Sequence, residues 1–301
     1  MPTHADDARE ITGPVRTALN RDDNSIHRAD TAHRLGFRGA AVGANLHLDI
    51  FAPLLVHAYG PQWFERGALS LYFLNVIVSG EPVQAVVQAP PAPAAPIRIH
   101  AHRPGDPVLR VCEGSASLGD HSQSELRSRD LRTCDDEGLR MLRGVKPGMS
   151  MGAMVRVATG AEQQARLAEG LINEPMDWYG GASPWGGPIA SVGSTARMLL
   201  RLPHGEGEAD QMRPDLFPHV GEAAGMFGAF EIAYEHGPVM LDRPYRVEGT
   251  VVGVGESPKT EYLWWDAIAR DEHGTAIVRM RELLRFLKAS SPLYPELAGT
   301  A

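Results

Sequence analysis

The order of apolar and polar positions predicts a chain built mainly from β-strands. In the first half, β-branched, aromatic and other apolar residues gather in short runs that end at Gly or Pro, as is typical of strands separated by turns. We expect strands over 68–78, 83–88, 97–102 and 108–117. The proline-rich segment 90–96 predicts a surface loop, because proline has no amide hydrogen to give to a neighbouring strand.

One apolar segment of the first half follows a helical period. Over 44–58, Leu46, Ile50 and Leu54 recur at the spacing of one helix face, and a Gly-Pro pair follows as a stop signal. Pro53 lies inside this segment, so the helix is either kinked there or shorter than the pattern. An apolar helix embedded in an antiparallel sheet predicts an α+β fold.

The second half repeats this order of elements. Helical patterns at 162–170 and 190–200 precede four predicted strands, which cover 229–234, 245–254, 261–270 and 275–286. The order of helix before strands is therefore the same in both halves, as expected if the chain contains two copies of one fold.

A weak internal sequence similarity supports this duplication. Glycine-rich segments at 36–43 and 184–190 each stand directly before a predicted helix. The charged and weakly periodic segment 126–145 predicts the connection between the copies. We therefore expect one domain over 1–125 and a second over 146–301.

Composition and charge narrow the possible partners and surroundings. The chain has 301 residues, of which 43% are hydrophobic, enough for two domains with real cores. With 29 Lys and Arg against 37 Asp and Glu, its net charge is −8, and no basic block is present, so we expect neither nucleic acid nor a membrane as partner. The sequence lacks a secretory signal pattern and an apolar run of about 18 residues, which favours a cytoplasmic protein.

Cysteine and histidine usage favours neither a disulfide framework nor a metal site. The two cysteines, Cys112 and Cys134, stand far apart and outside any Cys-x-x-Cys pair. His100 and His102 alternate on one predicted strand, with no further ligand at a suitable spacing.

The most informative polar cluster lies in an early loop, where Asp22 and His27 stand five positions apart. A carboxylate and an imidazole that converge on one water molecule can hold it, take its proton and return one. Spacing alone favours a turn aspartate beside a surface histidine. The surrounding residues are therefore needed to choose between these readings.

Those surroundings resemble the hydratase motif of the MaoC-like hot-dog family. The run Asp22-x-Asn24-Ser25-Ile26-His27 is similar to the family's Asp-x-Asn-Pro-(Ile/Leu)-His loop, and Gly36-Phe37-x-Gly39 to the Phe-x-Gly sequence that leads into its central helix. The resemblance is close over 20–45 and extends by element order over 1–120. It implies a tandem (double) hot-dog fold, in which an antiparallel sheet wraps around a long central helix in each half.

The resemblance also implies a reaction: hydration of an enoyl thioester, or dehydration of a 3-hydroxyacyl thioester, carried by coenzyme A or a carrier protein. Asp22 and His27 match the catalytic pair, and Asn24 a loop-shaping position. Gly43 and Ala44 match the start of the central helix, whose backbone N–H groups stabilise the oxyanion. No cofactor or metal is expected, and a two-copy chain can act as a monomer or pair as a homodimer.

Several positions depart from the family's pattern. Arg21 replaces a glycine and can lower the pKa of the neighbouring carboxylate, Ser25 replaces a proline, and 41–44 replaces a turn that often carries a second histidine. His47 on the predicted helix is a supporting candidate. Two alternatives therefore stay open. One is an enzyme that has diverged from the family's activity and dehydrates, isomerises or cyclises an unusual metabolite, and the other is a non-catalytic acyl-binding subunit.

The second copy lacks the Asp/His pair, and Glu174 stands roughly where its histidine would fall. We interpret this copy as a degenerate half that completes the sheet and shapes an acyl pocket. Arg34 and Arg38 are scattered cations that could contact a coenzyme A phosphate. The candidate pocket residues are large and apolar, which fits a protein core equally well. They are Trp178, Tyr179, Trp185, Met226, Phe227 and Phe230.

Overall fold

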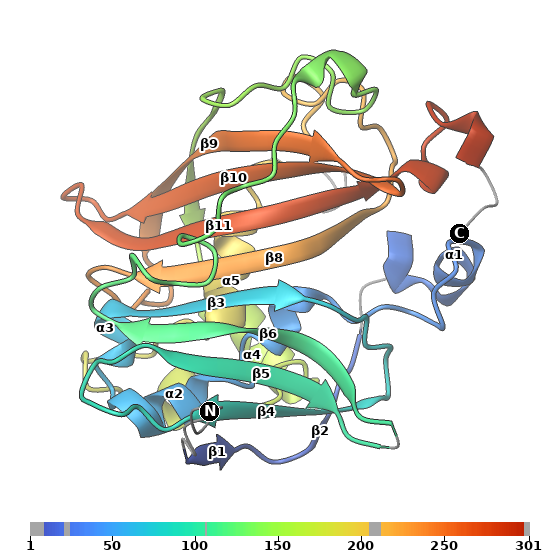
Figure 1. Cartoon of the computed structure of the whole chain (residues 1–301). Coiled ribbons are helices and arrows are strands. Elements are labelled where there is room, and N and C mark those ends of the chain that lie inside the picture. Colours follow the sequence, from blue (N-terminus) through green and yellow to red (C-terminus); the bar gives the residue numbers. More distant parts are fainter. Residues whose placement is uncertain (1–8, 21–24, 106, 205–211, 298–301) are drawn as a thin grey trace, which may run out of the picture.

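The computed structural model of the chain describes residues 9–20, 25–105, 107–204 and 212–297. Within them, one antiparallel sheet runs through the whole molecule (Figure 1). Its strands are ordered β1-β4-β5-β6-β3-β8-β11-β10-β9-β7, and β2 pairs with β4 beside this path. The strands are β1 (Glu10–Thr12), β2 (Arg16–Thr17), β3 (Gly67–Phe73), β4 (Pro82–Gln88), β5 (Ile97–Arg103), β6 (Leu109–Leu118), β7 (Ser150–Val157), β8 (Gly225–Tyr234), β9 (Pro244–Glu256), β10 (Thr260–Arg270) and β11 (Ala276–Leu287).

The two halves of the chain form the two sides of this sheet. Strands β1 to β6 belong to the first half and β7 to β11 to the second, and β3 pairs with β8 where they meet, from Ala68 opposite Ala233 to Tyr72 opposite Ala229. The predicted strands are confirmed, with shifted ends. β3 stops at Phe73 because the next two amides both turn to the carbonyl of Val111.

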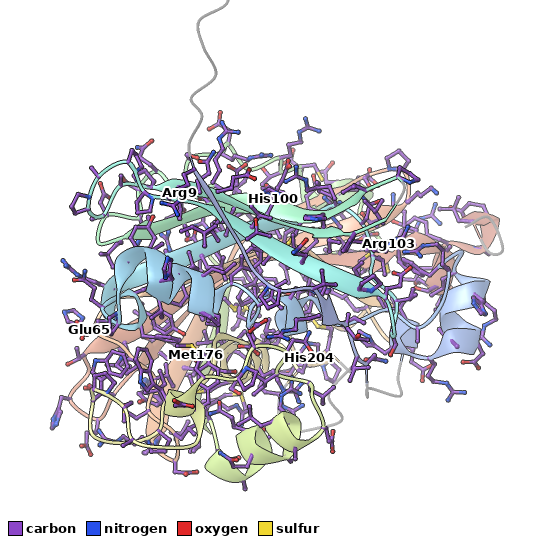
Figure 2. All side chains as sticks on the ribbon, turned by 90° about the horizontal axis from the view of Figure 1, so that it is seen from below. Arg9, Glu65, His100, Arg103, Met176 and His204 are labelled. Atoms are coloured by element: carbon purple, nitrogen blue, oxygen red, sulfur yellow. The ribbon has the colours of Figure 1, made fainter. Side chains whose placement is uncertain are left out.

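The longer α-helices lie on one face of the sheet. In Figure 1 the helices α2, α4 and α5 lie behind the strands, and Figure 2 shows His100 on the sheet side and Met176 and His204 on the helical side. The α-helices are α1 (Ala29–Arg34), α2 (Ala52–Tyr59), α3 (Trp63–Arg66), α4 (Gly160–Ala168) and α5 (Val192–Leu200). Short 3-10 helices are η1 (Ser25–His27), η2 (Ala44–His47), η3 (Asp136–Gly138), η4 (Asp177–Tyr179), η5 (Lys288–Ser290) and η6 (Pro295–Leu297).

The expected long central helices are shorter than predicted. In the first half, turns over 48–51 separate η2 from α2, which has 8 residues, and Pro53 lies in its first turn. Proline is tolerated there because the first amides of a helix have no acceptor within it. In the second half, the helix predicted over 190–200 is α5, which has 9 residues. Pro53 thus lies at the start of a short helix, and the predicted helix over 44–58 is divided before it.

Buried polar contacts join the two halves beneath the sheet. Ser191 caps the N-terminus of helix α5, and its hydroxyl accepts a hydrogen bond from the amide of Ser194 at 3.0 Å. Asp49, from the first half, is fully buried and accepts a hydrogen bond from the amide of Gly193 at 2.9 Å. The first half therefore helps to cap the helix of the second half.

The predicted connection, 126–145, packs tightly on the outer face of the sheet. Leu126 lies in an apolar cluster with Trp264 and Leu283. The buried carboxylate of Glu261 accepts hydrogen bonds from the amides of Arg140, at 2.7 Å, and Leu142, at 2.8 Å. This segment is therefore part of the packed structure and covers apolar surface that the second half would otherwise expose.

The sequence pattern missed three strands. Two of them, β1 and β2, have three and two residues, too few for a periodic signal. The third, β7, lies at the edge of the sheet and has several exposed positions, Val155 among them. An edge strand is partly solvated on both faces, which removes the clean alternation that identifies a half-buried strand.

Candidate functional site

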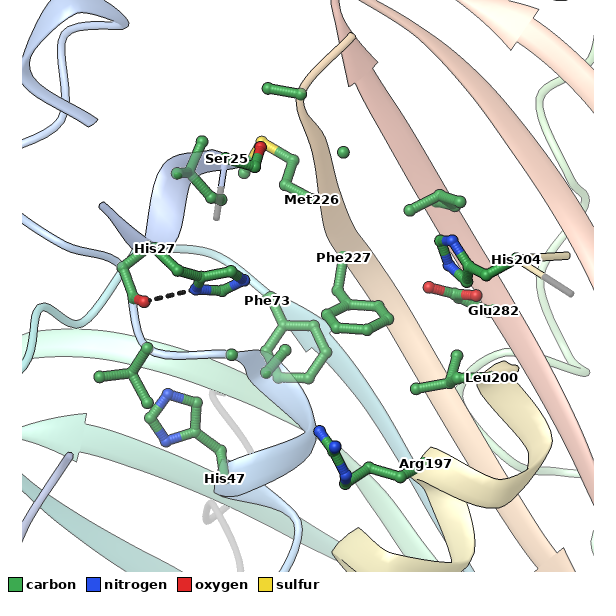
Figure 3. Close-up of a pocket in the computed structure, with 18 of the residues that line it drawn as sticks. Ser25, His27, His47, Phe73, Arg197, Leu200, His204, Met226, Phe227 and Glu282 are labelled. Atoms are coloured by element: carbon green, nitrogen blue, oxygen red, sulfur yellow. Dashed lines mark hydrogen bonds between the residues drawn. The ribbon is translucent and has the colours of Figure 1, made fainter. Parts of the chain in front are cut away.

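A cavity of about 1190 Å³ opens beneath the sheet and takes its walls from both halves of the chain (Figure 3). The first half contributes η1, helix α1, the start of η2 and the segment after β3. The second half contributes the C-terminal end of β7, helices α4 and α5, the start of β8 and the middle of β11. The cavity is large enough for a small-molecule ligand.

His27 reaches into this cavity from the end of η1. Its ring Nδ1 lies 2.7 Å from the carbonyl oxygen of Ala41. A carbonyl only accepts hydrogen bonds, so Nδ1 carries the proton and Nε2 presents its lone pair. Figure 3 shows the ring extending from that carbonyl toward Phe73 and Phe227. The histidine is thus held in one tautomer, with its other ring nitrogen directed into the cavity beside Phe73 and Phe227.

The backbone positions expected to bind the oxyanion line the same cavity. Gly43 lies directly before η2, and Ala44 is its first residue. The first amides of a helix have no acceptor within the helix itself, so they remain available to a ligand. Ser25 also lines the cavity, and its buried hydroxyl has no hydrogen-bond partner among the described residues. The structure therefore brings His27, Ser25, Gly43 and Ala44 together.

His47 lies on the same wall, one turn further along. Its side chain is 2% exposed, and burial lowers the pKa of its imidazole to about 4. At neutral pH the ring is therefore uncharged. Its Nδ1 has no hydrogen-bond partner among the described residues. The prediction that His47 faces the site is compatible with this position, as a polar neutral group.

Arginine side chains lie around the cavity. Arg34, Arg197 and Arg201 all contribute to its lining. Nε of Arg197 donates a hydrogen bond to Glu162 at 3.1 Å. Arg38, the other predicted cation, instead pairs with Glu81, which lies outside the cavity. Arg34 is therefore the better placed of the two predicted cations.

The aromatic pocket candidates divide into two groups. Met226 and Phe227, at the start of β8, line the cavity. Trp178 and Trp185 instead pack edge-to-face at 5.4 Å between ring centroids and surround Phe64, as does Tyr179. None of these three, nor Phe230, lines the cavity around His27. Trp178, Tyr179 and Trp185 instead stabilise a contact between the halves. Glu174 does so too, through its ion pair with Arg16.

Sequence reasoning missed Glu282, a buried acid in the cavity wall. It is 1% exposed, and one carboxylate oxygen accepts a hydrogen bond from Nε1 of Trp265 at 2.6 Å. Burial raises the pKa of the Glu282 carboxyl to about 8. The signal was present in the alternation of β11, where Glu282 takes an inward position between the inward residues Met280 and Leu284.

Comparisons with solved structures find the same architecture. One match is a protein named as a MaoC domain dehydratase from Chloroflexus aurantiacus, with a TM-score of 0.59, 12% identity and coverage of 93% of this chain and 95% of that one. Another is a MaoC-like dehydratase, with a TM-score of 0.54, 11% identity and coverage of 93% and 98%. A third, from Mycobacterium tuberculosis, is described as having a double hotdog fold, with a TM-score of 0.58, 13% identity and coverage of 93% and 96%.

The chain has the fold of the MaoC-like hot-dog proteins. The hot-dog fold that the loop motif implied is thereby confirmed, whereas the tandem arrangement of two copies stays a prediction. No family model and no curated protein matches the sequence. Because the identities are low, the likeness concerns the fold, and the chemistry has to be argued from the residues of this chain.

Part of the predicted motif lies outside the described residues. Asp22 and Asn24, together with Arg21, fall in the segment 21–24. The placement of Asp22 relative to His27 therefore stays a prediction. In the part of the chain that the structure describes, no three His, Cys, Asp or Glu side chains gather as metal ligands. Within the same residues, no helix has the length and apolar character needed to cross a membrane.

Proposed function

We propose that this MaoC-like hot-dog protein is a hydro-lyase that hydrates an enoyl thioester or dehydrates a 3-hydroxyacyl thioester. The observation that carries the proposal is the placement of His27, whose Nδ1 is held by the carbonyl of Ala41 at 2.7 Å and whose Nε2 faces the cavity. A histidine with one fixed tautomer and a ring nitrogen directed into a cavity is suited to general acid–base catalysis.

In the dehydration direction, His27 and Asp22 act on the bound 3-hydroxyacyl thioester. Nε2 of His27 takes a proton from C2, and negative charge develops on the thioester oxygen. The amides of Gly43 and Ala44 stabilise that charge. The bond between C3 and the hydroxyl oxygen then breaks, and a proton delivered by the acid–base pair makes the leaving group water. Hydration follows the same steps in reverse.

We further propose that the chain contains two hot-dog copies, of which only the first keeps catalytic residues. An isolated bridge pairs Ala41 with Val78 directly before η2, and a second pairs Ile189 with Met240 directly before α5. These bridges lie at the two glycine-rich segments whose similarity suggested duplication. Both copies contribute to the cavity, so the second copy supplies the wall along which an acyl chain extends.

Turnover of simple thioesters tests this function. Crotonyl-CoA and 3-hydroxybutyryl-CoA report the two directions through the absorbance of the enoyl thioester. We expect His27→Gln and Asp22→Asn each to lower kcat/KM by roughly 10²-fold or more, since each removes a proton-transfer group. His33→Gln is the matched control, because His33 is exposed and its ring hydrogen-bonds the nearby carbonyl of Arg38, at 3.1 Å.

Two results would contradict the assignment. Full activity of His27→Gln would remove the histidine from the mechanism. Tight binding of acyl thioesters without turnover, unchanged by substitution of His27 or Asp22, would identify a non-catalytic acyl-binding protein instead. Longer enoyl thioesters belong in the same assay, because the volume of the cavity exceeds what a four-carbon chain requires.

A further inference from the structure

A buried acid lines the part of the cavity that belongs to the second half. Glu282 lies in the middle of β11, and its side chain points to the same face of the sheet as those of Met280 and Leu284. In Figure 3, Glu282 and His27 lie on opposite sides of Phe227. Glu282 is therefore remote from the proposed reacting atoms and touches the region that an acyl chain would reach.

Only one of its two oxygens is satisfied within the protein. Oε2 accepts the hydrogen bond from Trp265 at 2.6 Å, whereas Oε1 is buried and has no hydrogen-bond partner among the described residues. Buried polar atoms in folded proteins almost always have a partner, because an unpaired one loses its hydration without compensation. The hydrogen bond to Oε2 fixes the orientation of the side chain, and Oε1 remains available to bond a ligand.

The surroundings decide what kind of group this site binds. The nearby lining is mainly apolar and includes Leu200, Phe227 and Leu284. Burial there raises the pKa of the carboxyl to about 8, so at neutral pH the group is mostly protonated and uncharged. A neutral carboxylic acid donates through its O–H and accepts through its remaining lone pairs. Such a group suits an uncharged oxygen function and disfavours a purely alkyl one.

A second polar side chain lines the same cavity on the second-half side. His204 follows α5 and contributes to the wall, and Figure 3 shows it on the same side of Phe227 as Glu282. A wall built only to hold a saturated chain would consist of apolar side chains, as most of this one does. Glu282 and His204 therefore bring two polar side chains together in this part of the wall.

We propose that Glu282 recognises an oxygen function, namely a hydroxyl, keto or ether oxygen, on the acyl chain of the substrate. This inference rests on the proposed function for the orientation of the substrate, with its thioester near His27 and its chain toward β11. The protein is then selective for oxygenated acyl chains over plain fatty acyl chains. A site that hydrogen-bonds a substrate oxygen discriminates strongly against a ligand that lacks it, because the buried group is left unpaired.

Binding of unreactive ligands tests this recognition separately from catalysis. Calorimetry compares octanoyl-CoA with the isomers that carry one hydroxyl group at successive carbons beyond C3. We expect at least one isomer to bind the wild-type protein on the order of tenfold more tightly than octanoyl-CoA. This difference in affinity corresponds to one additional buried hydrogen bond. Equal affinity for octanoyl-CoA and all the isomers would overturn the inference, as would the absence of binding by every thioester.

Variants then assign the preference to this side chain. Glu282→Gln keeps a neutral group that can donate, accept and still bond Trp265, so we expect it to retain the preference. Glu282→Leu should abolish the preference, whereas the apolar exchange Leu283→Met, on the opposite face of the sheet and outside the cavity, should leave it intact. A preference that survives Glu282→Leu would overturn the inference. The wild-type comparison requires no variant, so a variant that fails to fold does not decide the outcome.

The same experiment separates this inference from the proposed function. Hydroxyl-dependent binding without turnover of any enoyl or 3-hydroxyacyl thioester would refute the hydro-lyase and leave chain recognition by Glu282 standing. Turnover that depends on His27, together with equal binding of all chains, would refute the recognition and leave the hydro-lyase standing.

Discussion

The buried carboxyl of Asp49 allows a sharp test of how the two halves are held together. Its side chain is fully buried and accepts a hydrogen bond from the amide of Gly193 at the start of α5. Burial raises the pKa of this carboxyl from its usual 3.8 to about 6, although the helix amides and Arg166 act in the opposite direction. The raised pKa means that the folded protein binds this proton more tightly than the unfolded chain does.

The sign and size of the effect follow from these values. The favourable contribution of the protonated group is fully present below pH 3.8 and is lost as pH rises through about 6. Each pH unit between the two values corresponds to about 1.36 kcal/mol, so ionised Asp49 costs about 3 kcal/mol at neutral pH. Asp49→Asn is neutral at every pH and keeps an acceptor for Gly193. We therefore expect it to be about 1–3 kcal/mol more stable than wild type at pH 7, with a smaller difference at pH 4.

Urea unfolding followed by tryptophan fluorescence measures this difference at the two pH values. Asp130→Asn is the matched control, since Asp130 is exposed in the connecting segment and its substitution should change stability little. An Asp49→Asn protein that is less stable at pH 7, or whose advantage is the same at pH 4, would refute the reasoning. The first result would mean that Asp49 serves mainly as a charged cap of α5, and the second that the difference in stability does not arise from ionisation of Asp49.

Two further predictions concern packing around the sheet. Glu261→Ala should lower the free energy of unfolding by about 3–5 kcal/mol, because it leaves several amides of the connecting segment without an acceptor. Glu261→Gln keeps one acceptor, so it should lower the free energy of unfolding by less in the same urea measurement. Gly114→Ala should lower the free energy of unfolding by at least about 1–3 kcal/mol, because the added Cβ would lie 1.9 Å from the carbonyl oxygen of Ser70. Gly187→Ala is its control, since its nearest neighbour would lie 3.5 Å away, and equal thermal stability of both variants would contradict this account.

Local sequence determined the parts of this protein that depend on short-range patterns. The strands β4, β5, β6, β9 and β10 follow directly from runs of apolar and β-branched residues between turns. The position of Pro53 allowed a shortened helix, which the structure has. The loop motif around His27 pointed to the fold and to a histidine that faces the cavity. These features are encoded by neighbours in the chain, so the order of residues is enough to find them.

Only the tertiary structure decided which distant residues meet. Trp178 and Trp185 looked like pocket residues, but they pack around Phe64 from the other half, because the sequence does not reveal which apolar side chains face one another. Asp49 reaches α5 and Glu282 enters the cavity through contacts between segments far apart in the chain. Burial and the partners of a polar group depend on such contacts, so the pKa values and the shape of the cavity follow from packing rather than from local pattern.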